Sequence, residues 1–313
     1  MTGQTAVPIK MTTKKKLIVT GANGFVAGSI LAQAGEEWQV HALSRGEPPG
    51  RRTNLSWHAY DPLVSGQLNQ LFYAVKPEAV IHTAALADID FCQANPDLAR
   101  AVNVELTRTL AGLCDQTGAK LVFCSTDTIF DGERAPYDEL AQPGPINFYA
   151  ETKVEAEQIV TRMHAPAVIA RLSLVVGLPV LGAGNSFLAR MVASFKEGRP
   201  VGATPHEVRT PVDVITVGRA LLELAAGQQK GSYHLAGQDR LNRFQIAQKI
   251  AARFGFSPQL VVAQPVAATP GRAARPRDVS LNNAKVCAEL KTPMRTLDEA
   301  LSLILKMSQT PLL

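Results

Sequence analysis

Short apolar runs alternate, through the first half of the chain, with longer stretches in which apolar residues recur every three or four positions. The short runs are typical of buried strands and the periodic stretches of amphipathic helices. The alternation predicts βαβ units that form a parallel sheet covered by helices on both faces. Strands are expected at residues 17–20, 39–44, 57–59, 79–82, 121–125, 167–172 and 232–236. Helices are expected at residues 25–34, 65–75, 96–117, 147–163, 185–196, 215–227, 243–254 and 296–307.

The regular alternation breaks after Val175, where Gly and Pro become frequent, and resumes near residue 215. We therefore expect an α/β fold with a Rossmann-type, doubly wound parallel sheet formed by residues 16–175 and 212–236. A smaller, discontinuous substrate-binding lobe is expected from residues 176–211 and 237–313. Residues 1–15 are expected to form a disordered tail.

A glycine-containing turn follows the first expected strand directly and opens a helix. In this position glycines let the backbone approach a pyrophosphate at the positive end of a helix. An ordinary strand-to-helix turn is the alternative, but the order of strand, turn and helix favours a dinucleotide site. Its expected residues are Gly21, Asn23, Gly24, Phe25 and Val26.

The ends of the next strands suggest which dinucleotide binds. Ser44 and Arg45 stand where a carboxylate would hold the ribose hydroxyls of NAD, so they favour NADP(H) over NAD(H) unless Arg45 is only a surface arginine. Asp61 either accepts a hydrogen bond from the adenine amine or starts a turn with Pro62. Small residues after the fourth strand either line the cofactor or pack beneath helices; they are Thr83, Ala84 and Ala85.

Tyr149 and Lys153 lie four residues apart in an expected helix and so share one helical face. A nearby ammonium stabilises phenolate, and we expect it to lower the pKa of Tyr149 toward neutral pH, where a phenol can act as an acid catalyst. The alternative is an exposed helix pair. A strand that ends in hydroxyls at Ser125 and Thr126 precedes this helix and favours the catalytic interpretation.

Composition narrows the classes of function. The chain has 313 residues, of which 46% are hydrophobic, and carries a formal charge of +5 without a long basic cluster, so small anions fit better than nucleic acid. No apolar run is long enough to span a membrane, and we expect a cytoplasmic protein. Four dispersed cysteines without metal-ligand spacing predict reduced thiols and no metal. Asp88 and Asp90 are expected in a solvated loop.

Three motifs together resemble the extended short-chain dehydrogenases/reductases: Thr20-Gly-Ala-Asn-Gly24, Ser125-Thr-Asp127 and Tyr149-x-x-x-Lys153. The segments at 84–92 and 125–132 are most similar to the dTDP-4-dehydrorhamnose reductase family. The resemblance implies that Thr126 holds the substrate carbonyl, that Tyr149 donates a proton, and that Lys153 lowers the pKa of the phenol while binding the nicotinamide ribose. It also implies an auxiliary role for Asp127.

The C-terminal half departs from this family's pattern. The stretch from His206 to Asp213 lacks the Asp-Gln and Pro-Thr pairs of these reductases, while Arg209 resembles the phosphate-binding arginine of broader sugar-nucleotide enzymes. Arg275 and Arg277 resemble a segment that lines the sugar-nucleotide site, and guanidinium groups suit phosphate recognition. No acidic cluster in this stretch balances the three arginines.

The resemblance implies an NADPH-dependent reductase of a nucleotide-linked 4-keto-6-deoxy sugar, with a homodimer as a candidate assembly. Two alternatives stay open. One is a sugar-nucleotide epimerase of the same superfamily, which would use the same Tyr and Lys. The other is a non-catalytic, NADP-binding subunit that resembles the regulatory β subunit of methionine adenosyltransferase, although such a subunit has no chemical need for Thr126, Tyr149 and Lys153 together.

Overall fold

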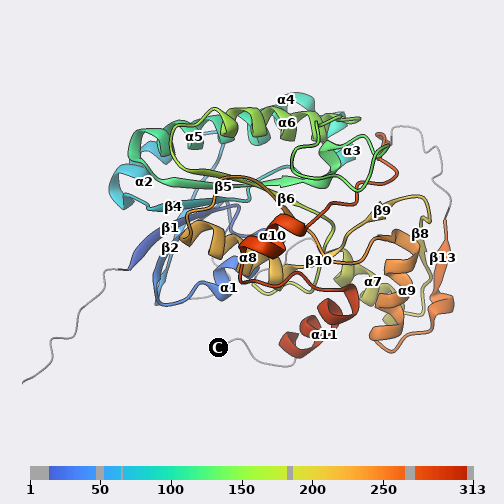
Figure 1. Cartoon of the computed structure of the whole chain (residues 1–313). Coiled ribbons are helices and arrows are strands. Elements are labelled where there is room, and N and C mark those ends of the chain that lie inside the picture. Colours follow the sequence, from blue (N-terminus) through green and yellow to red (C-terminus); the bar gives the residue numbers. More distant parts are fainter. Residues whose placement is uncertain (1–13, 47–52, 65, 182–185, 265–271, 309–313) are drawn as a thin grey trace, which may run out of the picture.

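The computed structural model describes residues 14–46, 53–64, 66–181, 186–264 and 272–308 (Figure 1). Most of the expected tail, Ser65 and the expected helix start at Asn185 lie outside the described residues. Lys15, which we expected to belong to the tail, begins the first strand instead.

Seven strands form one fully parallel sheet in the order β11-β6-β5-β4-β1-β2-β3, which confirms the predicted Rossmann-type fold. The central strands β4 and β5 are buried along their whole length, as expected for strands covered on both faces. The strands are β1 (Lys15–Thr20), β2 (Trp38–Ser44), β3 (Leu55–Ala59), β4 (Ala79–His82), β5 (Lys120–Thr126), β6 (Ala167–Leu172) and β11 (Gly231–Leu235). The strand order reverses between β1 and β4, and ligands of open α/β sheets bind at such a point.

Helices cover both faces of the sheet (Figure 1). On one face α1 (Phe25–Gln33) packs beside α8 (Val214–Ala226) over an apolar cluster that includes Trp38 and Leu221. On the other face α2, α5 and α6 pack over a cluster that includes Phe72 and Leu110. Their bounds are α2 (Gln67–Val75), α5 (Leu106–Thr117) and α6 (Phe148–Thr161).

A smaller group of elements lies beside the carboxyl ends of the strands and has its own apolar cluster, with Phe195, Ile250 and Leu301 fully buried or nearly so. Its helices are α7 (Phe187–Lys196), α9 (Arg243–Arg253) and α11 (Leu297–Ser308), whereas α10 (Ala284–Glu289) packs against β11 of the main sheet. Short strand pairs connect them: β7 (Val175–Val176) with β10 (Val212–Asp213), β8 (Val201–Ala203) with β13 (Val261–Ala263), and β9 (Val208–Arg209) with β12 (Leu241–Asn242). We keep the predicted boundaries of the two lobes as a proposal.

One local prediction was wrong, and another was confirmed in its extent but not in its regularity. Helix α3 (Ile89–Ala94) occupies part of an expected loop, because the Asp88 carboxylate accepts a hydrogen bond from the Phe91 N–H at 2.9 Å and caps it. The single helix expected at 96–117 is divided into α4 (Pro96–Arg100), a π-helical turn (Ala101–Glu105) and α5. A turn of this kind is frequent at functional sites.

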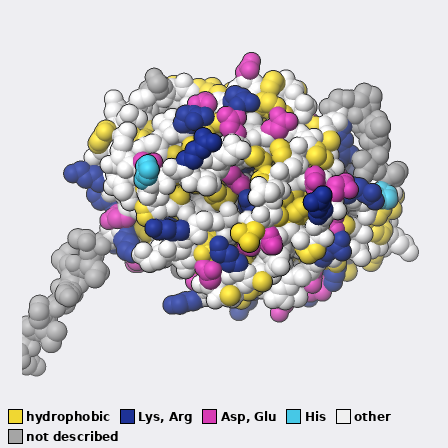
Figure 2. Space-filling view, turned by 45° about the horizontal axis from the view of Figure 1, so that its top comes forward, with side chains coloured by type: hydrophobic (Ala, Val, Ile, Leu, Met, Phe, Trp, Pro, Cys, Tyr) yellow, Lys and Arg dark blue, Asp and Glu magenta, His cyan; other side chains and the backbone are white. Residues whose placement is uncertain are grey.

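In the view of Figure 2, basic and acidic side chains are interspersed, and neither sign of charge dominates the visible face. Within the described part of the chain, no helix is both long enough and apolar enough to cross a bilayer.

The turn after β1 yields a stability test. Gly21 has φ +67°, and a Cβ there would lie 2.8 Å from the Ala84 Cα. We expect Gly21→Ala to lower the free energy of unfolding by about 1–3 kcal/mol. The substitution strains the backbone and forces apart the loops that follow β1 and β4. Gly112→Ala is the control: it lies inside α5 with nothing within 4 Å of the added Cβ, and it should stabilise by about 0.5–1 kcal/mol. Urea unfolding of both variants measures the difference, and equal effects would contradict the argument.

Candidate active site

The turn from Gly21 to Gly24 joins β1 to α1, and its backbone can come close to a ligand. Gly24 is the N-cap of α1 and makes no side-chain cap bond, so the first N–H groups of the helix are open to an anion. A Cβ at Gly28 would lie 2.5 Å from the Leu181 carbonyl oxygen, so this glycine lets the loop after β7 pack against α1. These features fit the pyrophosphate of a dinucleotide.

A cavity of about 260 Å³ begins at this turn and extends between β2 and the loop after β4. Apolar residues such as Leu43 and Tyr60 form part of it, as expected for an adenosine site. It brings together most of the predicted cofactor residues: Gly21, Asn23, Gly24, Ser44, Arg45, Thr83, Ala84 and Ala85. Asp61 is not among the lining residues. Its carboxylate accepts a hydrogen bond from the Leu63 N–H at 3.0 Å, which supports the turn alternative.

Asn103, in the π-helical turn, holds the loop that separates this cavity from the next one. Its side-chain amide donates to the Leu86 carbonyl at 3.0 Å and accepts from the Leu86 N–H at 2.8 Å. The same amide donates to the Thr152 hydroxyl at 3.0 Å on α6. The position of the loop is therefore fixed relative to the helix that carries Tyr149 and Lys153.

A second, larger cavity of about 940 Å³ adjoins the first and shares Gly24, Thr83 and Ala85 with it. It lies between the carboxyl ends of the strands and the smaller group of elements. The predicted residues that line it are Phe25, Val26, Thr126, Asp127, Tyr149, Arg209 and Arg275. Predicted site residues from both halves of the chain therefore line the same cavity.

Tyr149 and Lys153 lie side by side on α6, but not as an exposed pair: they are 8% and 2% exposed. The Lys153 ammonium donates to the Cys124 carbonyl at 2.7 Å and lies 4.1 Å from the centre of the Phe123 ring. Burial lowers the pKa of Lys153 to about 8. The cation is thus buried one helical turn from the phenol on the same helix.

The expected lowering of the Tyr149 pKa is wrong for this structure. Burial raises the pKa of Tyr149, and the carboxylate of Asp127 raises it further, while a hydrogen bond with Thr126 opposes the rise. The desolvation of a phenolate is the largest of these effects. A phenol that keeps its proton at neutral pH suits a proton donor.

Asp127 and Arg209 form a buried pair at the floor of the larger cavity. Their side chains are each 6% exposed, and the Arg209 Nε lies 3.6 Å from an Asp127 carboxylate oxygen. Burial raises the pKa of Asp127, against the effect of Arg209 and of a hydrogen bond from Ser173. Arg209 also lies 3.9 Å from Glu207.

The expectation that the arginines lack balancing carboxylates is wrong. Arg275 forms a two-pronged ion pair with Asp90, with contacts of 2.6 and 2.8 Å, and that pair lowers the pKa of Asp90. Asp90 comes from α3 and Asp127 from the turn after β5, and both are far away in sequence from these arginines. Arg277 is exposed and does not line the cavity, although its backbone carbonyl accepts a hydrogen bond from Val208.

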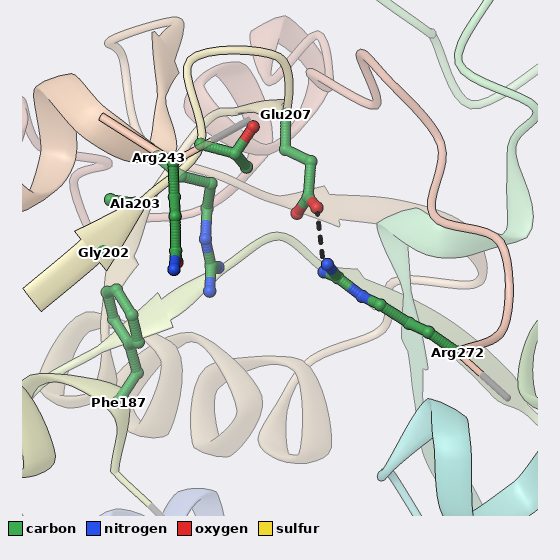
Figure 3. A pocket seen from close by; sticks show the side chains of 8 residues that line it. Phe187, Gly202, Ala203, Glu207, Arg243 and Arg272 are labelled. Atoms are coloured by element: carbon green, nitrogen blue, oxygen red, sulfur yellow. Dashed lines mark ion pairs between the residues drawn. The ribbon is translucent and has the colours of Figure 1, made fainter. Parts of the chain in front are cut away.

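Four cavity residues escaped the sequence predictions: Arg190, Glu207, Arg243 and Arg272. Arg272 lies three residues before the predicted Arg275, but nothing local marked the other three. Figure 3 shows Glu207 and Arg272 facing each other, 3.5 Å apart, near Arg243 at the edge of a third cavity of about 140 Å³. The Arg243 guanidinium stacks over the Phe187 ring at 4.4 Å. Around the larger cavity, the guanidinium groups outnumber the carboxylates, and this excess of positive charge favours an anionic ligand.

Within the described part of the chain, no three His, Cys, Asp or Glu side chains lie together in an arrangement that could hold a metal ion.

A protein-family model described as the RmlD substrate binding domain matches residues 15–310. This chain belongs to that family. A probable low-salt glycan biosynthesis reductase from Haloferax volcanii is 31% identical over 91% of this chain and 95% of its own length. The β subunit of methionine adenosyltransferase 2 from Bos taurus is 28% identical, over 89% and 82%.

Among solved structures, dTDP-4-dehydrorhamnose reductase from Bacillus anthracis in complex with NADP has a TM-score of 0.82 and 26% identity. The match covers 94% of this chain and 99% of that one. The predictions of an extended short-chain dehydrogenase/reductase related to these reductases, and of an NAD(P)-dependent enzyme, are confirmed.

The buried lysine allows a direct test of the site's electrostatics. Because burial disfavours the ammonium, Lys153 should lose its proton as the pH rises through about 8 rather than near its ordinary value of 10.5. The pH titration of a ¹³C-labelled lysine side chain by NMR measures this, and Lys153→Met identifies the resonance by its disappearance. A midpoint near the ordinary value would contradict the buried environment described here.

Proposed function

We propose that this protein is an NADPH-dependent reductase that delivers hydride to the carbonyl of a nucleotide-linked 4-keto-6-deoxy sugar. The observation that carries the proposal is the junction of the two cavities. One holds the features of a dinucleotide site, and the other combines a buried phenol with an excess of guanidinium groups. The similarity to dTDP-4-dehydrorhamnose reductases supports the same substrate class.

The bound cofactor would supply the hydride. Tyr149 would give its proton to the carbonyl oxygen as negative charge develops there, and the Thr126 hydroxyl would orient that oxygen. Lys153 would hold the ribose of the cofactor and keep positive charge near the phenol. Arg209 and Arg275 would bind the diphosphate, with Arg190, Arg243 and Arg272 adding positive charge around it.

A second candidate is a non-catalytic cofactor-binding subunit, favoured by the similarity to the methionine adenosyltransferase β subunit. The proton donor, the hydroxyl and the lysine are all present in this chain, which argues against it. Turnover discriminates the two: an enzyme oxidises NADPH in the presence of a keto-sugar nucleotide, whereas a binding subunit retains the cofactor without turnover.

Cofactor preference tests the role of Arg45, which lines the smaller cavity and is exposed. We expect NADPH to bind more tightly than NADH, and Arg45→Asp to reverse the order, because the variant loses a charge-assisted contact with the 2′-phosphate. Such a contact contributes about 1.5–3 kcal/mol, or roughly tenfold to a hundredfold in affinity. Fluorescence titration with both cofactors measures the ratio, and equal affinities of the wild-type protein would overturn the assignment.

The proton donor is tested by Tyr149→Phe. Turnover should fall by about two to four orders of magnitude, with cofactor affinity nearly unchanged, because the variant loses only the acidic hydroxyl. Tyr73→Phe is the matched control, since Tyr73 is 62% exposed on α2 and lines neither cavity. Near-normal turnover of the Tyr149 variant would mean that another group is the acid.

The phosphate site is tested by comparing two substrates. We expect Arg209→Ala to raise KM for a sugar nucleotide far more than KM for a small neutral ketone, because each lost charge-assisted contact costs about 1.5–3 kcal/mol. Arg277→Ala should change neither value much, because this side chain does not line the cavity. If the Arg209 variant affects both substrates equally, the arginine supports the fold rather than the phosphates.

A further inference from the structure

Five polar side chains form a buried, hydrogen-bonded row that runs from the end of β1 to α6. They come from five different elements, and each is 0–1% exposed: Thr20, His82, Asn103, Thr107 and Thr152. None of these five side chains lines either of the two cavities of the candidate active site. A buried polar network in which every member is hydrogen-bonded favours a single arrangement of the elements that it connects. The row can therefore act on the site only through the elements that carry it.

His82, at the end of β4, lies at the centre of the row. Its Nδ1 is 2.7 Å from the Thr20 hydroxyl, and its Nε2 is 3.1 Å from the Thr107 hydroxyl. The single proton of the Thr107 hydroxyl is donated to the Asn103 carbonyl at 2.8 Å, so Nε2 must carry a proton and donate it to the Thr107 oxygen. Burial lowers the pKa of His82 to about 3 and keeps the imidazole neutral, which leaves Nδ1 as the acceptor for the Thr20 hydroxyl. The contacts therefore select the tautomer with its proton on Nε2.

The loop after β4, which lines both cavities, is held by this row at its two ends. At the start of the loop, the Thr20 side-chain oxygen accepts a hydrogen bond from the Ala84 N–H at 3.2 Å. At its end, Leu86 makes both of its contacts with the Asn103 side chain. His82 directly precedes the loop and connects the residues that hold these two ends.

From Asn103 the row continues to the helix that carries the phenol. The Asn103 amide donates to the Thr152 hydroxyl at 3.0 Å, and this hydroxyl donates to the Tyr149 backbone carbonyl at 2.7 Å. Unbroken contacts thus join the strand that ends at the glycine turn to the residue that would donate the proton.

We propose that His82 is a positioning residue: as its Nε2–H tautomer it fixes the loop after β4 and, through Asn103, the Tyr149 phenol relative to the dinucleotide site. The proposal rests on the proposed reductase function, and it adds a residue that lines neither cavity. A displacement of reacting groups by about 1 Å can cost about a hundredfold in rate. Disruption of the row should therefore slow the chemical step more than it weakens the binding of either ligand.

The kinetic test uses Thr107→Val, which removes the acceptor of the His82 Nε2–H but nearly keeps the shape of the side chain. We expect kcat for NADPH-dependent reduction of a keto-sugar nucleotide to fall by about tenfold to a hundredfold, with KM for the sugar nucleotide and Kd for NADPH changed by less than about threefold. Thr107→Ser retains the hydroxyl and should restore most of the lost kcat.

Thr117→Val is the matched control on the same helix. The Thr117 hydroxyl also donates to the carbonyl four residues earlier at 2.8 Å, but it lies outside the row, so its loss should leave kcat unchanged. A purely structural role of the row would lower the melting temperature of Thr107→Val without lowering its kcat, and that result would overturn the proposal.

Two NMR measurements on the full chain need no substrate. The ¹⁵N shifts of labelled histidine rings distinguish the two tautomers, and the signals that change in Thr107→Val but not in Thr117→Val are those of His82. We expect the Nε2–H tautomer at neutral pH, and an Nδ1–H tautomer or a charged ring in the wild-type protein would overturn the proposal.

The second measurement follows tyrosine labelled with ¹³C at Cζ, where loss of a signal in Tyr149→Phe identifies the phenol. This signal should shift in Thr107→Val and stay in place in Thr117→Val, because only the first substitution disturbs the row. An unshifted signal in Thr107→Val would overturn the proposal. If the wild-type protein reduces no keto-sugar nucleotide, the proposed function fails, and the two NMR measurements still decide whether the row positions the phenol.

Discussion

The parallel arrangement of the strands, with a reversal of order between β1 and β4, is the constraint on which the site depends. Parallel strands place all of their carboxyl ends at one edge, and at the reversal the loops after β1 and β4 lie against each other. The glycine turn, the small residues after β4 and the hydroxyls at the end of β5 therefore face adjoining cavities. The smaller group of elements closes that space from the side and contributes the arginines.

Burial then decides the chemistry of the ionisable groups in this space. It raises the pKa of Tyr149 and Asp127 and lowers that of Lys153 to about 8. All three shifts disfavour the charged form, and the phenol of Tyr149 keeps a proton that it could donate. Arg209 is buried within 4 Å of the Asp127 and Glu207 carboxylates, which offset the cost of burying its guanidinium. The site is thus prepared both for an anionic ligand and for proton transfer.

The sequence predicted well whatever is set by local patterns. The strand runs, most helices, and the turn at Gly21 needed only apolar periodicity and glycine positions. Features that depend on tertiary contacts were missed, such as the ion pair of Arg275 with Asp90, which are 185 residues apart. The cap of α3 was also missed, because the Asp-Ile-Asp segment that contains it was interpreted as a solvated loop. The Tyr149 pKa was misjudged because helical spacing reveals the nearby lysine but not the depth of burial.

The central claim is that the two adjoining cavities bring a hydride donor to the carbonyl of a nucleotide-linked sugar. The most direct measurement is the reduction of a dTDP-linked 4-keto-6-deoxy sugar with NADPH that carries deuterium at the transferable position, followed by mass spectrometry and NMR of the product. The account predicts one deuterium per product molecule, at the former carbonyl carbon. Tight binding of the labelled cofactor with no deuterium in any nucleotide-linked keto sugar would contradict it.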